Sequence, residues 1–126
     1  MAWEQPEFSL SFVASKDLSS YQFEAVRLTT ALTISNITSA TSPIVGVLQD
    51  KPTSGVVGNV MVIGVSKIRA GGAFGRGAKI KVNAVATSVG GRFVDGTTSA
   101  TGYTAISKEA AATSGDIVTA IINFNV

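Results

Sequence analysis

The sequence contains neither cysteine nor histidine. Without cysteine the chain has no disulfide, and it has no thiolate to act as a nucleophile or a metal ligand. Without histidine it lacks the side chain that most often serves as a general base or zinc ligand near neutral pH. These absences exclude thiol chemistry and make a zinc site improbable. We therefore expect a protein that is not an enzyme, with no cofactor, no metal and no small-molecule substrate.

Charge is also scarce. Charged residues make up 14% of the 126 residues, against a usual share of about a quarter, while hydrophobic residues make up 45%. Ten basic and eight acidic side chains leave a net charge of +2, which is too small for a protein that binds nucleic acid by neutralising phosphates. A surface this poor in charge favours a protein that packs closely against other proteins.

No apolar run approaches the length of a membrane span, so no membrane partner is expected. Near the N-terminus stand Glu4 and Glu7, where a secretory signal would carry basic residues. We expect the chain to be made and used without secretion. Its length suggests one domain with a single core.

Threonine, serine, glycine and valine are plentiful, which favours strands and turns. About seven short strands, separated by glycine and proline, predict a mainly β fold: a small β-barrel or β-sandwich. The expected strands are 8–12, 21–28 with a bulge near Ala25, 44–48, 60–65, 78–84, 101–107 and 117–126. A tight hairpin is expected at Gly90–Val94 and one helical turn at Lys108–Ala112.

Two strands show a clear alternation of side chains. Lysine and asparagine alternate with apolar residues in 78–84, which predicts one wet and one buried face. In the last strand one face is wholly apolar and should lie in the core: Val118, Ala120, Ile122, Phe124 and Val126.

One construction occurs twice, as GVLQDKPTSGVVGNVMVIG and as AISKEAAATSGDIVTAIIN. Each copy runs from an apolar stretch through an acid (Asp50, Glu109) to Thr-Ser-Gly and then into a strand rich in valine or isoleucine. Two such units could pack about a pseudo-twofold axis in one barrel. Equally, Thr-Ser-Gly is an ordinary turn in a chain of this composition, and the sequence leaves both interpretations open.

The remaining polar residues show no pattern of a reactive site. No carboxylates stand at the spacing of a metal-binding loop. The stretch GGAFGRGAKIKV leads into a strand, whereas a phosphate-binding loop leads into a helix. Half of the basic residues gather there, either as a patch for an acidic partner or, the favoured interpretation, as solvated strand edges: Lys67, Arg69, Arg76, Lys79 and Lys81.

Residues 1–20 are interpreted as an N-terminal arm, and residues 21–126 as a single β-domain. The arm carries four large apolar side chains, three of them in strict alternation: Trp3, Phe8, Leu10 and Phe12. Two interpretations are nearly balanced. The segment adds as a strand to the sheet edge of a partner, with its side chains in pockets, or it is the first strand of its own domain.

The run from Pro43 to Gly72 resembles the small capsid decoration, or cement, proteins of tailed bacteriophages. Residues 20–126 follow the order of elements in that family: a Gly-Val-Leu strand, a Lys-Pro-x-x-Gly turn, a strand ending in Gly-Val-x-Lys, a Gly-Arg hairpin, then Glu-Ala-Ala and Gly-Asp. Here these elements are Gly46–Leu48, Lys51–Gly55, Gly64–Lys67, Gly91–Arg92, Glu109–Ala111 and Gly115–Asp116. One departure is Thr104–Lys108, where the family often reads Gly-x-Ala-Leu.

The resemblance implies a compact, β-tulip-like domain on the exterior of an icosahedral virion, present in the host cytoplasm during assembly. Such proteins bind the major capsid protein, commonly as homotrimers, and bridge coat subunits so that the expanded head is stabilised. They have no substrate. In that family the arm often pairs with a strand of the coat, which implies capsid binding through Trp3, Phe8, Leu10 and Phe12.

Other functions share this composition. One is a different part of a virion, such as a head fibre base or a tail component. Another is a non-viral β-barrel module that binds small ligands or glycans, for which Trp3, Tyr21 and Tyr103 are the aromatic candidates, although nothing in the sequence groups them.

Overall fold

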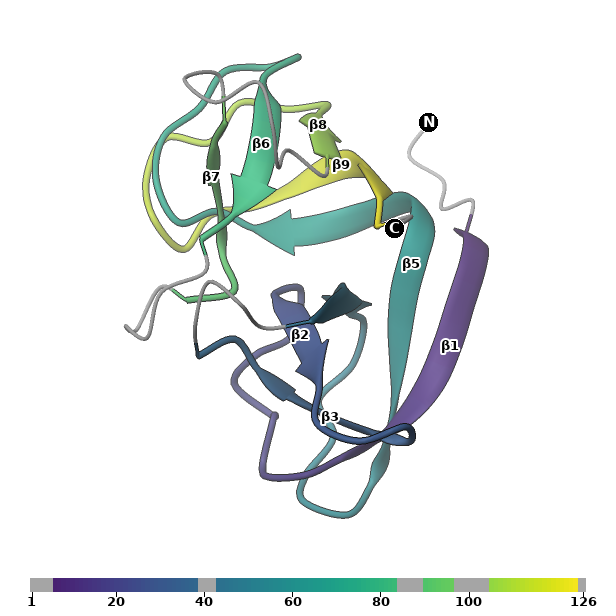
Figure 1. Ribbon diagram of the computed structural model, residues 1–126. Coiled ribbons are helices and arrows are strands. Elements are labelled where there is room, and N and C mark those ends of the chain that lie inside the picture. Colours follow the sequence, from purple (N-terminus) through teal and green to yellow (C-terminus); the bar gives the residue numbers. More distant parts are fainter. Residues whose placement is uncertain (1–5, 39–42, 84–89, 97–104, 125–126) are drawn as a thin grey trace.

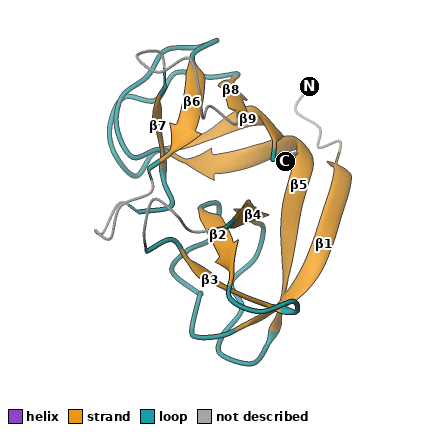
Figure 2. Cartoon of the chain, viewed as in Figure 1, coloured by secondary structure: helices purple, strands orange, loops and turns teal. Residues whose placement is uncertain are grey.

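The computed structural model describes residues 6–38, 43–83, 90–96 and 105–124. Within these residues there are strands, turns and bends but no helix, so none that could cross a membrane (Figure 2). The prediction of a mainly β fold is confirmed. The strands are β1 Pro6–Ala14, β2 Ala25–Leu28, β3 Thr33–Asn36, β4 Ile44–Leu48, β5 Val57–Arg69, β6 Lys79–Val82, β7 Phe93–Asp95, β8 Ala105–Ser107 and β9 Ile117–Asn123.

The first half of the chain forms a closed barrel, called barrel 1 here. Its strands follow the order β1-β3-β2-β4-β5, and β1 pairs antiparallel with residues 57–64 of β5 to close it. The β1–β3 pairing is parallel and short, and the other pairings are antiparallel. Its interior holds the buried side chains of Ala14, Leu18, Val26, Ile34, Leu48 and Val60.

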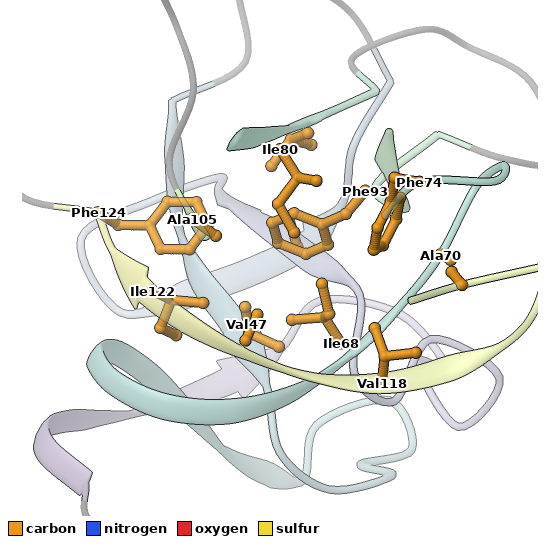
Figure 3. Packing of buried hydrophobic residues seen from close by; sticks show 14 of the residues in the cluster. Val47, Ile68, Ala70, Phe74, Ile80, Phe93, Ala105, Val118, Ile122 and Phe124 are labelled. Atoms are coloured by element: carbon orange, nitrogen blue, oxygen red, sulfur yellow. The ribbon is translucent and has the colours of Figure 1, made fainter. Parts of the chain in front are cut away.

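The second half forms another barrel of the same kind, called barrel 2. It consists of residues 63–69 of β5, then β9, β8, β6 and β7, and a parallel bridge between Ala70 and Phe93 closes it. Figure 1 shows the two barrels as separate lobes, with β5 running through both. The interior of barrel 2 includes Ile68, Phe74, Ile80, Phe93, Val118, Ala120, Ile122 and Phe124 (Figure 3).

The two barrels are structural duplicates. Each strand of barrel 1 has a counterpart in barrel 2: β1 corresponds to the second half of β5, β2 to β6, β3 to β7, β4 to β8, and the first half of β5 to β9. The counterparts have the same pairings and the same directions. The registers also agree: Ala14 lies opposite Ile34 as Ala70 lies opposite Phe93. Even a left-handed backbone recurs, with φ of 66° at Phe23 and 79° at Gly77.

The twice-used phrase stands at equivalent places in the two barrels. Each copy joins two antiparallel neighbours, β4 to β5 and β8 to β9. The glycine of each Thr-Ser-Gly has a left-handed φ, 80° at Gly55 and 97° at Gly115, and its N–H donates to a matching alanine carbonyl, that of Ala14 or Ala70. The phrase is therefore a repeated structural unit. The interpretation that both copies pack in one barrel is wrong, because each copy lies in its own barrel.

Several local predictions are confirmed. The strand predicted at 44–48 has the bounds of β4, and the described members of the apolar face of β9 are all buried. The bulge expected near Ala25 corresponds to an irregularity in the β2–β4 pairing, between Val26 and Arg27. The strand expected from Tyr21 begins only at Ala25, because the residues before it form a turn.

Other local predictions are wrong. The expected helical turn at 108–112 is a bend, because the N–H of Ala111 donates to Phe74 and the carbonyl of Ala111 accepts from it, which forms a bridge (2.9 and 3.1 Å). The hairpin between β6 and β7 is not tight, because Asn83 already pairs with Arg92 and the connection spans 84–91. The strand β3 was not predicted. The calls on Trp3, Tyr103, 101–104 and Val126 lie outside the described residues.

Candidate functional site

The predicted capsid-binding residues that can be placed lie on β1. Phe8, Leu10 and Phe12 belong to a strand that pairs antiparallel with β5, with Leu10 opposite Val60 and Phe12 opposite Gly58. The alternating segment is therefore the first strand of its own fold in this structure, which was one of the two interpretations.

One edge of β1 remains open to a partner. The strand β3 covers this edge only at Val13 and Ala14. The N–H groups of Val13 and Ser15 point to that side, since they donate to Leu32 and Ile34 at 2.9 Å. Peptide groups alternate in direction along a strand, so those of Ser9 and Ser11 face the same side, beyond the end of β3. Among the described residues no strand pairs with them there.

The three apolar side chains of β1 have different surroundings. Phe8 is 49% exposed and Leu10 is 39% exposed, whereas Phe12 is half-buried and packs against the core of barrel 1. Phe8 and Leu10 are thus available for a contact with another protein, and Phe12 mainly holds the strand in place.

The segment after β1 is anchored to barrel 1. Leu18 is fully buried, and its N–H donates to the carbonyl of Pro52 at 2.9 Å. The division at residue 20 into an arm and a domain stays a prediction. In the structure Pro6–Ala14 is a strand of barrel 1, and Leu18 belongs to the core of that barrel.

A buried acid lies where the barrels meet. Glu24 precedes β2, and its Oε2 is 3.5 Å from Nε of Arg69 in β5 and 3.8 Å from Nε of Arg92, which precedes β7. The side chain of Glu24 is only 4% exposed, and its Oε1 has no hydrogen-bond partner among the described residues. Desolvation raises the pKa of Glu24, and the two guanidinium groups oppose that rise without cancelling it.

The basic residues of the middle of the chain do not form one patch. Arg69 belongs to the barrel junction just described, and Nζ of Lys67 lies 5.8 Å from the ring centroid of Phe23. Arg76 is an exposed loop residue, and Lys79 and Lys81 lie on β6. These five basic residues are close in the sequence but have different surroundings in the structure.

The described residues contain no candidate metal-binding cluster. Within them, no group of three or more acidic side chains gathers as metal ligands would. Asp17, Glu109 and Asp116 accept hydrogen bonds from nearby backbone or side-chain groups, which lowers the pKa of each carboxyl. Such carboxylates stabilise turns. Tyr21 is half-buried against the core of barrel 1, so it is poorly placed as a stacking platform for a glycan.

A further exposed apolar pair was missed in the sequence. Ile106 in β8 and Ile121 in β9 lie directly opposite each other on the outside of barrel 2 and are 42% and 49% exposed. The signal was present, since Ile121 falls on the face of β9 opposite to Ile122.

Comparisons with known proteins bear on the fold. No protein-family model matches the sequence, and no curated protein sequence matches it. Among solved structures, the N base of head fiber gp8.5 of bacteriophage phi29 matches with a TM-score of 0.59 and 17% identity, over 94% of this chain and 95% of that one. A chain from the capsid of Myoviridae phage XM1 matches with a TM-score of 0.69 and 18% identity, over 94% and 84%.

This chain shares its fold with parts of two phage particles. The expected likeness to phage capsid-associated proteins is confirmed at the level of the fold, because both alignments extend over 94% of this chain. At identities below a fifth, the likeness concerns architecture.

Proposed function

We propose that this protein is a structural component of a phage virion that binds the outer surface of an icosahedral capsid and bridges neighbouring copies of the major capsid protein. In this role it stabilises the expanded head and is not an enzyme. The shared fold supports a place in the particle. The observation that carries the docking mode is the open edge of β1, with exposed Phe8 and Leu10 beside outward-facing peptide groups.

The proposed contact is β-augmentation. A strand of the coat protein pairs with the peptide groups of Ser9 and Ser11, which continues the sheet of barrel 1 past the end of β3. Phe8 enters an apolar pocket on the coat, because burying a large side chain supplies about 1.5–3 kcal/mol. Leu10 lies at the border of this contact. Trp3 precedes β1 in the chain and is proposed to extend the same contact.

Bridging stabilises the shell by mass action, because a ligand that binds only the expanded arrangement shifts the equilibrium towards it. A homotrimer would bind more tightly than three separate copies, since each first contact raises the effective concentration of the next. This mechanism requires no titratable group.

The test uses shells that lack this protein. Ser11→Pro removes the outward N–H of β1 while leaving its pairing with β5 intact, and Phe8→Ser removes the larger exposed side chain. Each should reduce cosedimentation with expanded shells at least tenfold. The matched control is Val57→Ser, since Val57 is equally apolar and 58% exposed but lies on β5. Deleting residues 1–14 is unsuitable, because β1 closes barrel 1.

Unchanged binding by both variants would refute docking through β1. The amount of this protein in gradient-purified virions, measured by quantitative mass spectrometry, tests the broader role. A ratio near one per coat subunit supports bridging, and absence from the virion removes the proposal altogether.

A second candidate is the base of a head fibre. It is favoured by the match to the phi29 head fiber base, which covers both chains almost completely. A fibre base would be present in far fewer copies than the coat protein, or at restricted sites on the shell, so the same mass spectrometry, with imaging of labelled virions, separates the two.

A further inference from the structure

The duplication allows each surface of one barrel to be compared with the same surface of the other. On the outside of barrel 1, Ala25, Val47 and Met61 form a row across β2, β4 and β5, paired as Ala25 with Val47 and Val47 with Met61. All three are buried, with exposures of 1%, 0% and 3%, and they belong to the hydrophobic core of barrel 2. Figure 3 shows Val47 near Ile68 and Ile122 of that barrel.

The same row in barrel 2 is uncovered. Its members are Lys79, Ile106 and Ile121, paired as Lys79 with Ile106 and Ile106 with Ile121. The two isoleucines are nearly half exposed, although their counterparts in barrel 1 are buried. The composition of the row is suited to a protein interface, because it has two apolar isoleucines and a single lysine at one end.

The surface that covers the first row also has a counterpart. Barrel 2 reaches barrel 1 through Ser66, whose hydroxyl accepts from Gln49 Nε2 (2.9 Å), and through Gly91, whose carbonyl accepts from Ala25 N–H (2.8 Å). The register places Leu10 of barrel 1 at the position of Ser66, and Leu32 at that of Gly91. Both leucines are exposed, Leu32 by 71%, the largest value among the large apolar side chains of the described residues.

We propose that copies of this chain associate head to tail by repeating the contact between its own two barrels. The row Lys79–Ile106–Ile121 of one copy packs against the Leu10–Leu32 surface of the next. Another copy is the occupant because both sides of the internal contact recur on one molecule, each uncovered and each apolar. The inference rests on the self-association within the proposed function, and its test does not require shells.

Two different surfaces make such a contact heterologous. Heterologous contacts build a ring if the rotation closes and an open chain if it does not. A closed ring of three copies would supply the homotrimer of the proposed function. Each copy would use one row and one leucine surface, and a closed assembly would leave neither uncovered.

The test is the mass of the full chain in solution, measured by light scattering after gel filtration. The wild type should be oligomeric, whereas Ile121→Asp and Leu32→Asp should each be monomeric, because a charge would be buried in the contact. The control is Ile117→Asp, which should assemble normally. Ile117 lies on the same strand and is 47% exposed, and its counterpart Val57 is exposed as well. Circular dichroism confirms that each variant folds, and Ile106→Ser provides a milder change in the same row.

Mixing distinguishes the two kinds of interface. Ile121→Asp retains an intact leucine surface and Leu32→Asp retains an intact row, so an equimolar mixture should form a one-to-one dimer that neither forms alone. A mixture that stays monomeric overturns the head-to-tail geometry. A monomeric wild type also overturns the proposal, and if Ile121→Asp then fails to bind shells, the coat protein occupies the row. Phe8→Ser should reduce shell binding at unchanged oligomeric mass, which separates this test from that of the proposed function.

Discussion

Asp50 and Glu109 occupy the same position in the two barrels and make the same bond. Oδ1 of Asp50 accepts the N–H of Asn59, and Oε1 of Glu109 accepts the N–H of Thr119, each at 3.0 Å. Each of those two strand residues also accepts a backbone hydrogen bond at its carbonyl, from Gln49 or Lys108. The acid therefore pins the start of a strand to the loop that precedes it.

Removing either acid should loosen its loop without unfolding the protein. Asp50→Ala and Glu109→Ala each leave a strand N–H to water, and because both positions are exposed the loss should stay below about 1 kcal/mol. In thermal unfolding, the melting temperature of each variant should fall by a few degrees. The control Ala110→Ser, at an exposed position next to Glu109, should leave the melting temperature unchanged. Since the Thr119 bond lowers the pKa of Glu109, its contribution is present above pH 4.5 and decreases as the pH falls below that value. Equal stability of all variants would contradict this role.

Backbone strain can be tested at two nearby glycines. Added methyl groups at Gly75 and Gly77 would meet no atom within 4 Å, but only Gly77 has a left-handed φ, 79°. Gly77→Ala should therefore destabilise the fold by about 1 kcal/mol, whereas Gly75→Ala should be neutral or slightly stabilising. Urea titration of both variants measures the difference, and two equal effects would mean that the turn relaxes around the new side chain.

Adjacent isoleucines in β9 provide a test of the core. Ile122 is 1% exposed and Ile121 is 49% exposed. Ile122→Asp buries an unpaired charge in barrel 2, which should cost several kcal/mol and abolish cooperative folding. Ile121→Asp should still fold and melt cooperatively. A soluble, cooperatively melting Ile122→Asp protein would show that the assigned faces of β9 are reversed.

The buried Glu24 should make stability depend on pH in a particular direction. Its folded-state pKa is raised above the ordinary 4.5, so the folded state binds the proton more tightly than the unfolded state does. The stability that neutral Glu24 contributes is complete below pH 4.5 and is lost as the pH rises through the folded-state pKa.

Comparison with Glu24→Gln isolates this effect from the carboxyls that titrate in the opposite sense, Asp17, Glu109 and Asp116. Between pH 4 and pH 7, wild-type stability in urea should decline relative to that of Glu24→Gln. A relative gain would mean that Arg69 and Arg92 outweigh desolvation.

Local patterns predicted much of the strand content. The alternation in β6 and β9 and the apolar run of β4 were readable because burial of one face imposes a period of two. β3 was missed, because its four residues carry one large apolar side chain, Ile34. The helical turn at 108–112 was predicted from helix-forming alanines, but the bridge to Phe74 is a tertiary contact that propensity does not contain.

The candidate site was only partly predictable. The alternation of Phe8, Leu10 and Phe12 correctly indicated a strand, but its pairing with β5 is a contact between residues roughly fifty apart in sequence, which no local pattern specifies. In the sequence the duplication was visible only in the repeated phrase around Thr-Ser-Gly, because equivalent core positions hold different side chains, such as Ile34 and Phe93. The two barrels share their pattern of backbone hydrogen bonds, and that pattern does not depend on which side chains occupy the core.

The continuity of β5 has a mechanical consequence. One strand passes from barrel 1 to barrel 2 around Gly64: it pairs with β1 and β4 up to residue 64 and with β9 from residue 63 onward. A force that pulled the barrels apart along this strand would load its hydrogen bonds in parallel, as shear, so that many would have to break at once. A linker between the same barrels would instead extend first and let them separate one contact at a time. The shared strand makes the pair respond to tension as one stiff element.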